Sequence, residues 1–339
     1  MIEVAVFGAG RIGYVHALNA ASHPRVKLKY IVDPVASAHR AELAEKTGAT
    51  ILEADTVFGD PDIAGVIIAS STNTHAELLL KAAEAQKAVF CEKPISLDFP
   101  TVADVTAKVE ASGIPCMLGF QRRYDASFRA LRERIASGAS GPLEQLTMSS
   151  RDPSPPPRSY VETSGGMFRD STIHDMDMAR FLLNEEIASV YAVGACLISE
   201  EIGAAGDIDS LMVTLTTVSG RMAQITACRR GPMGYDQRLE ALCAREVLAI
   251  ENQPQSMLVL STPEGRRTAA PENYFIERFR QAYRDEINAF VALIENGEAP
   301  LAGIRDGYEA QRLVEAAIVS MNTGQAVRFG TSWVPGGEG

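Results

Sequence analysis

The stretch EVAVFGAGRIG, residues 3–13, decides the fold of this protein. Its first residues are mostly apolar and predict a short strand from Glu3 to Phe7. The glycines that follow have the spacing Gly8-x-Gly10-x-x-Gly13. The first permits a tight turn, the second lets a ligand approach the backbone, and the third lets a helix pack on the sheet with its N-terminus facing phosphates. Strand, loop and helix together predict a dinucleotide-binding site.

Asp33 supplies the second part of this fingerprint. It follows the predicted strand Leu28 to Val32, twenty residues beyond Gly13, where a carboxylate can accept hydrogen bonds from both ribose hydroxyls. It would repel a 2′-phosphate, and Pro34 stands where an NADP site would offer an arginine. We therefore predict NAD as the cofactor. The alternative interpretation makes the glycines a plain turn and Asp33 a helix cap.

Apolar runs and helical patterns alternate as far as residue 120. Strands are predicted at 3–7, 28–32, 65–69, 88–91 and 116–119, and helices near 11–21, 35–47, 74–86 and 98–112. Asp98 is the expected N-cap of the last helix. This alternation predicts a parallel, doubly wound Rossmann sheet with helices on both faces, which we assign to a domain of residues 1–120.

The pattern changes after residue 120. Helices are predicted near 125–138, 170–183, 274–295 and 303–322, and strands at 143–150, 187–199, 208–218, 220–229, 235–244 and 246–251. Successive strands joined by turns such as Ser219-Gly220 predict a large, mostly antiparallel sheet. We therefore expect a second, α+β domain over residues 121–339, whose last helix can pack back on the first domain.

The charge balance excludes several partners. The 339 residues carry a net charge of −11 and include no basic block, so neither nucleic acid nor an anionic membrane is an expected partner. No apolar run approaches the roughly 18 residues of a membrane span, and MIEVAVF does not read as a signal peptide. The composition favours a globular protein with a small-molecule ligand.

The cysteines are widely spaced and contain no C-x-x-C pair. An odd number without paired spacing predicts reduced, buried thiols in a cytoplasmic protein and no cysteine metal site. These residues are Cys91, Cys116, Cys196, Cys228 and Cys243.

Polar residues follow the third predicted strand, at the edge where doubly wound sheets bind ligands. Ser71, Thr72 and Asn73 could line the cofactor cleft, with His75 close behind. Thr74 can cap the next helix, so the alternative is an ordinary capped loop.

The run AVFCEKP, residues 88–94, ends the fourth predicted strand at the same edge. Lys93 would emerge near the glycine loop, where it can donate hydrogen bonds to a substrate oxygen and stabilise alkoxide character. The alternative is a solvated Glu92–Lys93 pair at a strand end.

The run GGMFRDSTIHDMDMARFLL begins at Gly165 and carries acid–base chemistry. Asp170 and His174 stand four residues apart and share one face of a helix. An imidazole oriented by an aspartate suits removal of a proton from a secondary alcohol near neutral pH. One alternative is a divalent metal site with Asp175 and Asp177, but hydride transfer to a nicotinamide needs no metal and no second histidine is near, so no metal is predicted. The other is an amphipathic helix that Asp170 merely caps.

With these motifs the sequence resembles the glucose-fructose oxidoreductase / inositol dehydrogenase / MocA-like family. The resemblance covers nearly the whole chain through FGAGRIG, SSTNTHAELLLKAAEAQKAVFCEKP, GFQRRYD and GGMFRDSTIHDMDMARFL, in the expected order. Within the family, the run SRDPSPPPRSYVETSGGMFRDSTIHDMD is most similar to the inositol 2-dehydrogenases.

The resemblance implies catalysis by Lys93, Asp170 and His174, with His174 as the acid/base and a Lys93–Pro94 bond that is often cis. The implied reaction is NAD-dependent oxidation of a cyclic polyol, myo-inositol foremost, to 2-keto-myo-inositol (scyllo-inosose). Scyllo-inositol, an inosamine, or an aldose such as glucose or xylose are alternative substrates, and an NAD(H)-sensing regulator without turnover is an alternative function. The open sheet of such proteins often serves assembly, so a homo-oligomer, dimer or tetramer, is expected.

The resemblance also implies two sets of binding residues. The cofactor set is Gly8, Gly10, Arg11, Ile12, Gly13, Asp33, Ser71, Thr72, Asn73, His75, Glu92, Lys93 and Arg122. The substrate set is Lys93, Arg122, Asp152, Asp170, His174 and Tyr235, with Tyr124 and Asp125 nearby. Three of these predictions have plain alternatives: Arg122 could pair with surface acids, the PSPPP segment after Asp152 could be a rigid linker, and Tyr235 could be a packing residue.

Overall fold

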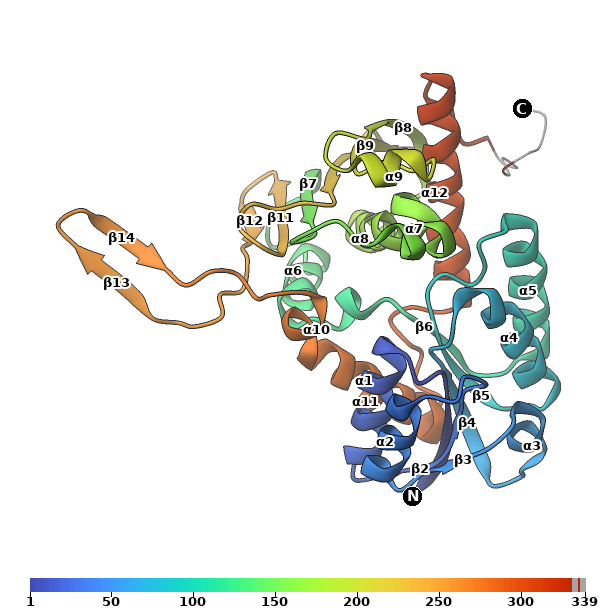
Figure 1. Ribbon diagram of the computed structural model, residues 1–339. Helices are drawn as coiled ribbons and strands as arrows, with labels where there is room; N and C mark the ends of the chain where they lie inside the picture. Colours follow the sequence, from blue (N-terminus) through green and yellow to red (C-terminus); the bar gives the residue numbers. More distant parts are fainter. Residues whose placement is uncertain (331–334, 336–339) are drawn as a thin grey trace. The chain divides into compact units, whose positions relative to one another are not determined.

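The computed structural model describes residues 1–330 and 335, which form two compact units (Figure 1). The first unit comprises Met1–Asp125 and Gln281–Glu309, and the second comprises Ala126–Arg280 and the chain from Ala310 on. The sequence-based division placed all of 121–339 in the second domain, whereas 281–309 group with the first unit. Helix α12 (Ile304–Thr323) begins in the first unit and continues in the second.

The first unit is built on a six-stranded sheet in the order β3-β2-β1-β4-β5-β6, and every neighbouring pair is parallel. Its strands are β1 (Ile2–Phe7), β2 (Val26–Val32), β3 (Thr50–Ile51), β4 (Ile63–Ile68), β5 (Ala88–Glu92) and β6 (Cys116–Gly119). The chain moves outward from β1 in one direction through β2 and β3, and in the other through β4 to β6. The prediction of a doubly wound parallel sheet is therefore confirmed.

Helices cover both faces of this sheet (Figure 1). They are α1 (Arg11–Ser22), α2 (Ala38–Thr47) and α11 (Arg280–Asn296) on one side, and α3 (Ala54–Gly59), α4 (His75–Glu84) and α5 (Phe99–Ser112) on the other. Asp98 accepts a hydrogen bond from the backbone of Thr101 at 3.0 Å and caps α5 as predicted. Gly65 lets α11 approach, because a β-carbon there would lie 2.8 Å from the ring of Phe290. Segments 225 residues apart along the chain thus share one core.

The second unit contains a seven-stranded sheet in the order β12-β11-β7-β10-β9-β8-β15. Its strands are β7 (Leu143–Arg151), β8 (Ile187–Ala195), β9 (Ser210–Thr217), β10 (Met222–Cys228), β11 (Asp236–Cys243), β12 (Val247–Ile250) and β15 (Val327–Arg328). Every pair is antiparallel except β10 with β7. The prediction of a large, mostly antiparallel sheet is confirmed.

The helices of the second unit are short apart from α12. They are α6 (Ala126–Ala136), α7 (Arg158–Ser164), α8 (Ile173–Leu183), α9 (Glu200–Ala204) and α10 (Phe275–Arg278). The helix predicted over 170–183 is preceded by a π-helical turn, Phe168–Thr172, so its regular α-helical part begins three residues later than predicted. Such a turn shifts the helical register by one residue and is frequent at functional sites.

A hairpin that sequence reasoning missed extends from the second unit (Figure 1). Its strands β13 (Val259–Thr262) and β14 (Gly265–Thr268) pair with each other and with no other strand of the described chain. All of its strand residues are exposed. The run lacks the alternation of apolar and polar residues that a half-buried strand shows, which is why it gave no signal.

The cysteines are all free, and Cys91 and Cys243 are buried. Cys196 is exposed, so the prediction that the thiols are buried is wrong for this residue. It follows β8, beyond the part of that strand that packs against the core. A membrane-spanning helix is absent from the described residues, since none has the required length and hydropathy.

Candidate active site

The carboxyl ends of the parallel strands gather most of the predicted cofactor residues at one sheet edge. The glycine loop follows β1, Ser71 to His75 follow β4, Lys93 follows β5, and Arg122 follows β6 in a 3₁₀ turn. Between β1 and β4 the order of strands reverses, and ligands of doubly wound sheets bind at this point.

The glycine loop leaves room for phosphates. Gly8 has φ +100°, and a β-carbon there would lie 2.4 Å from the carbonyl oxygen of Ala69. A β-carbon at Gly13 would lie 2.2 Å from the carbonyl oxygen of Gly8. At Gly10, the N-cap of α1, nothing lies within 4 Å of that position. Gly8 and Gly13 therefore serve the turn and the packing, and the position of Gly10 is open to a ligand at the helix N-terminus, which fits a dinucleotide.

Asp33 is tied to the same loop. Its carboxylate accepts hydrogen bonds from the backbone of Ala9 at 2.7 Å and of Val35 at 2.8 Å, one on each oxygen. Each oxygen keeps a further lone pair that can accept from a ribose hydroxyl. Beside it, Arg11 is exposed and Ile12 is half-buried at the start of α1. This arrangement fits NAD, whose ribose offers two hydroxyls.

The predicted residues of the loop after β4 differ in solvent exposure. Ser71 and Asn73 are exposed and Thr72 is half-buried, so all three are within reach of solvent. His75 is buried, with Nδ1 2.8 Å from the carbonyl oxygen of Pro94 and Nε2 3.1 Å from that of Ser70. Burial lowers the pKa of His75. Its nitrogens therefore join two loops of the site, and direct contact with the cofactor stays a prediction that these bonds do not favour.

Glu92 and Lys93 differ in burial, since Glu92 is buried and Lys93 is half-buried. The Lys93–Pro94 peptide bond is cis, as the resemblance implied, and the Lys93 side chain is half-buried. The carboxylate of Glu92 lies inside the unit, 2.7 Å from Nε2 of His16. Direct contact of Glu92 with the cofactor stays a prediction, which this hydrogen bond does not favour. Arg122 is 6% exposed, which does not fit the alternative of a surface ion pair.

In the second unit an arginine joins two of the predicted substrate residues. Arg229 is only 3% exposed and donates to Asp152 at 3.1 Å and to Asp170 at 3.3 Å. Burial alone would lower its pKa, but the charges of Asp170 and Asp152 raise it overall. The arginine stays charged, and it compensates two carboxylates that would otherwise repel each other.

Asp170 has a second donor. The hydroxyl of Tyr160, on α7, donates to its other oxygen at 3.0 Å. Burial, and then Asp170, raise the pKa of Tyr160, so its proton is retained at neutral pH. Asp170 lies in the π-helical turn and His174 lies half-buried in the first turn of α8. Contact of Asp170 with the imidazole stays a prediction.

The glycines before Met167 have a structural purpose. A β-carbon at Gly166 would lie 2.7 Å from Oδ1 of Asp207, and both Asp207 oxygens accept from the backbone of Met167, at 3.2 and 3.0 Å. Gly166 therefore permits the backbone to approach a carboxylate of the same unit closely.

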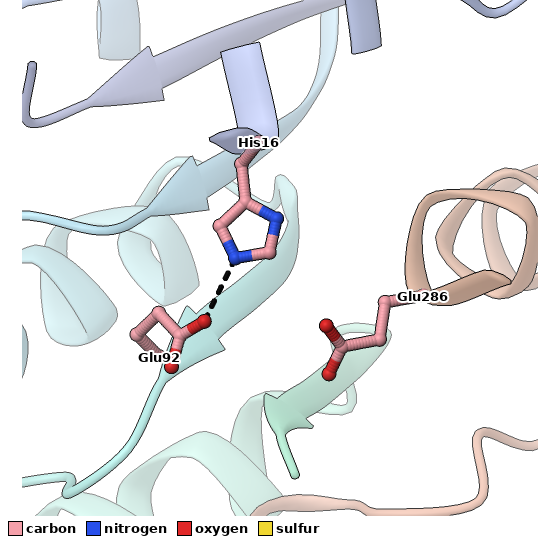
Figure 2. A group of neighbouring side chains, drawn as sticks. All are labelled: His16, Glu92 and Glu286. Atoms are coloured by element: carbon pink, nitrogen blue, oxygen red, sulfur yellow. Dashed lines mark hydrogen bonds and ion pairs between the residues drawn. The ribbon is translucent and has the colours of Figure 1, made fainter. Parts of the chain in front are cut away.

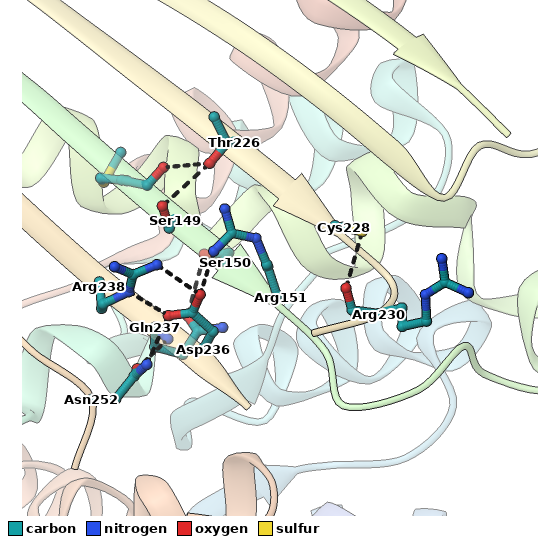
Figure 3. Close-up of polar contacts among 11 residues, drawn as sticks. Ser149, Ser150, Arg151, Thr226, Cys228, Arg230, Asp236, Gln237, Arg238 and Asn252 are labelled. Carbon is teal, nitrogen blue, oxygen red and sulfur yellow. Dashed lines mark hydrogen bonds and ion pairs between the residues drawn. The ribbon is translucent and has the colours of Figure 1, made fainter. Parts of the chain in front are cut away.

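A polar network joins the end of β7 to the start of β11, next in sequence to Asp152 and Tyr235 (Figure 3). Asp236, buried, accepts from Arg238 at 2.7 Å, from Asn252 at 2.8 Å, and from Arg151. Burial by itself would raise the pKa of Asp236, but these donors lower it overall. Because Arg151 precedes Asp152 and Asp236 follows Tyr235, the network holds both chain segments in place.

Tyr235 lies in an aromatic cluster. Its ring is edge-on to Tyr274 at 5.4 Å and to Phe279 at 6.3 Å between ring centroids. This favours the packing interpretation, and a bond to a substrate hydroxyl stays a prediction.

One cluster of described residues has the spacing of metal ligands, and it lies in the first unit. It consists of His16, Glu92 and Glu286. The alternative metal set around Asp170 and His174 does not form such a cluster among the residues described.

Arg229, Tyr160, His16 and Glu286 were missed by sequence reasoning. A signal existed for three of them. Arg229 continues the inward alternation of Ala223, Ile225 and Ala227 along β10, and His16 and Glu286 stand at buried positions of α1 and α11. An ionisable residue at an inward position marks a buried polar contact.

Comparison with known proteins gives matches over nearly the whole chain. The model of an oxidoreductase family with an NAD-binding Rossmann fold, GFO/IDH/MocA, matches residues 2–120, and the model of the GFO/IDH/MocA C-terminal domain matches 128–249. An inositol 2-dehydrogenase of Rhizobium meliloti is 41% identical over 94% of this chain and 97% of its own. A myo-inositol 2-dehydrogenase of Thermotoga maritima is 37% identical over 97% of this chain and 98% of its own.

Solved structures agree with these matches. A myo-inositol dehydrogenase of Corynebacterium glutamicum superposes with a TM-score of 0.93 at 39% identity, over 98% of this chain and 100% of that one. A scyllo-inositol dehydrogenase of Lactobacillus casei, solved with NAD(H) and scyllo-inositol bound, has a TM-score of 0.89 at 27% identity, over 97% of this chain and 99% of that one.

Proposed function

The chain belongs to the GFO/IDH/MocA family of NAD-dependent oxidoreductases, and from this premise we propose that it oxidises a cyclic polyol, myo-inositol, to 2-keto-myo-inositol. The observation that carries the proposal is the identity of 37 to 41% to inositol 2-dehydrogenases over nearly the full length. The three residues that the chemistry needs, Lys93, Asp170 and His174, all stand in their motifs.

The cofactor is held by the glycine loop and Asp33, with Arg11, Ile12, and the loop Ser71 to Asn73 alongside. NAD, when bound, accepts the hydride from the ring carbon that is oxidised. The protein supplies position and charge. We assign cofactor binding to the domain of residues 1–120, and polyol binding and assembly to 121–339, of which 281–309 group with the first unit.

His174 removes the proton of the reacting hydroxyl and carries it as an imidazolium. Asp170 orients the imidazole and stabilises its charged form, and is itself held by Arg229 and Tyr160. Lys93 donates to the reacting oxygen and stabilises alkoxide character there. Arg122 and Asp152 bind further hydroxyls, since one offers donors and the other acceptors.

The function is tested by NADH formation with NAD and a panel of myo-inositol, scyllo-inositol, glucose and xylose. Wild type is expected to turn over myo-inositol fastest, and Lys93→Ala to lose the signal while it still binds NAD. Scyllo-inositol is included because a relative has been solved with it bound. If wild type binds NAD and oxidises none of the four, a sensing regulator becomes the better explanation.

Assembly into a dimer or tetramer is supported by the outer face of the large sheet. Val193 of β8 and Met212 of β9 are directly paired, and both are exposed, as are Tyr191 and Met222 on the same face. An apolar patch across neighbouring strands is typical of a surface covered by a partner, and a second copy can cover it isologously. Light scattering is expected to give a multiple of 36.5 kDa, and Val193→Lys with Met212→Lys to give the monomer mass. A monomeric wild type would contradict assembly.

We place the protein in the cytoplasm, as free cysteines suit a reducing compartment.

A further inference from the structure

Three ionisable side chains meet in the interior of the first unit (Figure 2). His16 comes from α1, Glu92 from the end of β5, and Glu286 from α11. His16 and Glu286 are 0% exposed and Glu92 is 8% exposed. Nε2 of His16 lies 2.7 Å from Oε1 of Glu92, and one ligand atom from each of the three residues lies within 4.8 Å of the others. We call these residues the buried triad.

The surroundings are shaped to hold the triad. Gly119 on β6 pairs with Glu92, and a β-carbon there would lie 2.8 Å from Oε2 of Glu92. The absent side chain leaves the space that the carboxylate occupies. The His16 ring is held edge-on by Phe90, at 4.8 Å between centroids, and by Tyr283 at 5.7 Å. Neither Glu92 nor His16 can turn away without disturbing the core.

Glu286 completes the triad from the third side. Among the residues that the structure describes, neither of its oxygens has a hydrogen-bond partner, and the same holds for Nδ1 of His16. Figure 2 shows its carboxyl group directed at the His16–Glu92 pair. Oxygen atoms within 4.8 Å of each other can be bridged by one bound water.

The charge of the triad favours a neutral Glu286. Burial, and then the nearby charge of Glu92, raise the pKa of Glu286 well above its usual range. Tyr283 packs against His16, and the charge of Glu92 also acts on His75 and Cys91. Burial, and then the charge of Glu286, raise the pKa of Tyr124. As a carboxylic acid Glu286 can donate a hydrogen bond toward Glu92, and it does not add a second buried negative charge.

The second oxygen of Glu92 connects the triad to Lys93. The backbone N–H of Lys93 donates to Oε2 of Glu92 at 3.3 Å, while Oε1 faces His16. We propose that His16 and Glu286 are positioning residues for Lys93, acting through the carboxylate of Glu92. The inference rests on the catalytic role proposed for Lys93. If the support is lost, Glu92 can rotate and the backbone at Lys93 can shift, which misaligns the ammonium group with the reacting oxygen.

The test compares Glu286→Leu with Glu286→Gln in the full-length protein with NAD and myo-inositol. Glu286→Leu is expected to lower kcat by about tenfold to a hundredfold, the effect of a small misplacement of a catalytic group. Its melting temperature should not fall, because an apolar side chain replaces a buried polar one. Glu286→Gln should keep kcat within about threefold, since its amide donates as the neutral acid does. Likewise, His16→Leu is expected to lower kcat more than His16→Gln does.

The control is Glu295→Gln, an exposed position on the same helix, which should leave kcat and NAD affinity unchanged.

Crystal structures of wild type and Glu286→Leu show whether the Lys93 backbone has moved, and this comparison does not depend on which polyol is the substrate. No oxidation of any polyol by wild type would refute the proposed function, and a displaced Lys93 would still support the positioning role. An unmoved Lys93 with a normal kcat in Glu286→Leu would refute the inference alone. Elemental mass spectrometry tests for a bound metal. If it finds one divalent ion per chain, and Glu286→Gln loses both this ion and activity, the triad is a structural cation site and the positioning role is refuted.

Discussion

Replacement of His174 by asparagine is expected to lower kcat for myo-inositol by about 10² to 10⁴, the range by which a positioned general base accelerates proton transfer. Asparagine retains a polar side chain of similar size, but it cannot take up a proton. Because the contacts proposed for NAD come from the glycine loop, Asp33 and the loop Ser71 to Asn73, and not from His174, the affinity for NAD should change little. The rate of NADH formation at saturating polyol gives kcat, and fluorescence titration gives the affinity for NAD.

The matched control is His39→Asn, since His39 is an exposed histidine on α2. It should leave the rate close to that of wild type. A near-normal rate in His174→Asn would remove this residue from the mechanism. A loss of NAD binding would show instead that the substitution disturbs the fold.

Replacement of Arg229 by methionine is expected to damage stability and activity together. The arginine is the buried cation between Asp152 and Asp170, and its removal leaves two carboxylates without their compensating charge. Loss of one partner of a buried pair costs about 3–5 kcal/mol of the free energy of unfolding. Asp170 also loses a donor that holds its carboxylate, so kcat/KM should fall by about a hundredfold. Urea unfolding and steady-state kinetics at pH 7 measure the two effects.

The stability loss should depend on pH in a defined direction. Without Arg229, the folded protein holds two negative charges near each other that the unfolded chain keeps apart, so protonation of one carboxylate is more favourable in the folded state than in the unfolded state. Protonation relieves the repulsion, so the difference from wild type should shrink as pH falls from 7 to 5. Arg230→Met, at the exposed neighbouring position, is the control and should unfold like wild type. A deficit that is unchanged across this pH range would contradict the charge argument.

The first sheet could be predicted because its signals are local. A strand that runs into Gly8, Gly10 and Gly13 constrains the loop by backbone geometry alone, and Asp98 caps α5 through a contact three residues away. The carboxyl-edge position of Lys93 follows from the direction of the chain in a parallel sheet. These inferences depend only on residues close together in the sequence and on the common direction of the strands in a parallel sheet.

The residues that hold Asp170 and Glu92 in place could not be predicted in the same way. The inward alternation of β10 marks Arg229 as unusual, but its partners Asp152 and Asp170 stand 77 and 59 residues away along the chain. The helical spacing of α1 likewise predicts that His16 is buried, but it does not predict that the partner is Glu92, 76 residues further along the chain. The π-helical turn that carries Asp170 has no sequence signature in the run FRDST.

The sequence by itself determined the Rossmann architecture, the dinucleotide fingerprint, the family, and the identities of Lys93, Asp170 and His174 as candidate catalytic residues. Only the tertiary structure decided that Arg229 and Tyr160 hold Asp170 and that His16, Glu92 and Glu286 share one buried space. The reason is physical. Backbone conformation responds to the nearest residues, whereas a buried charge is compensated by whichever group the folded chain brings within hydrogen-bond distance, however far away in sequence that group stands.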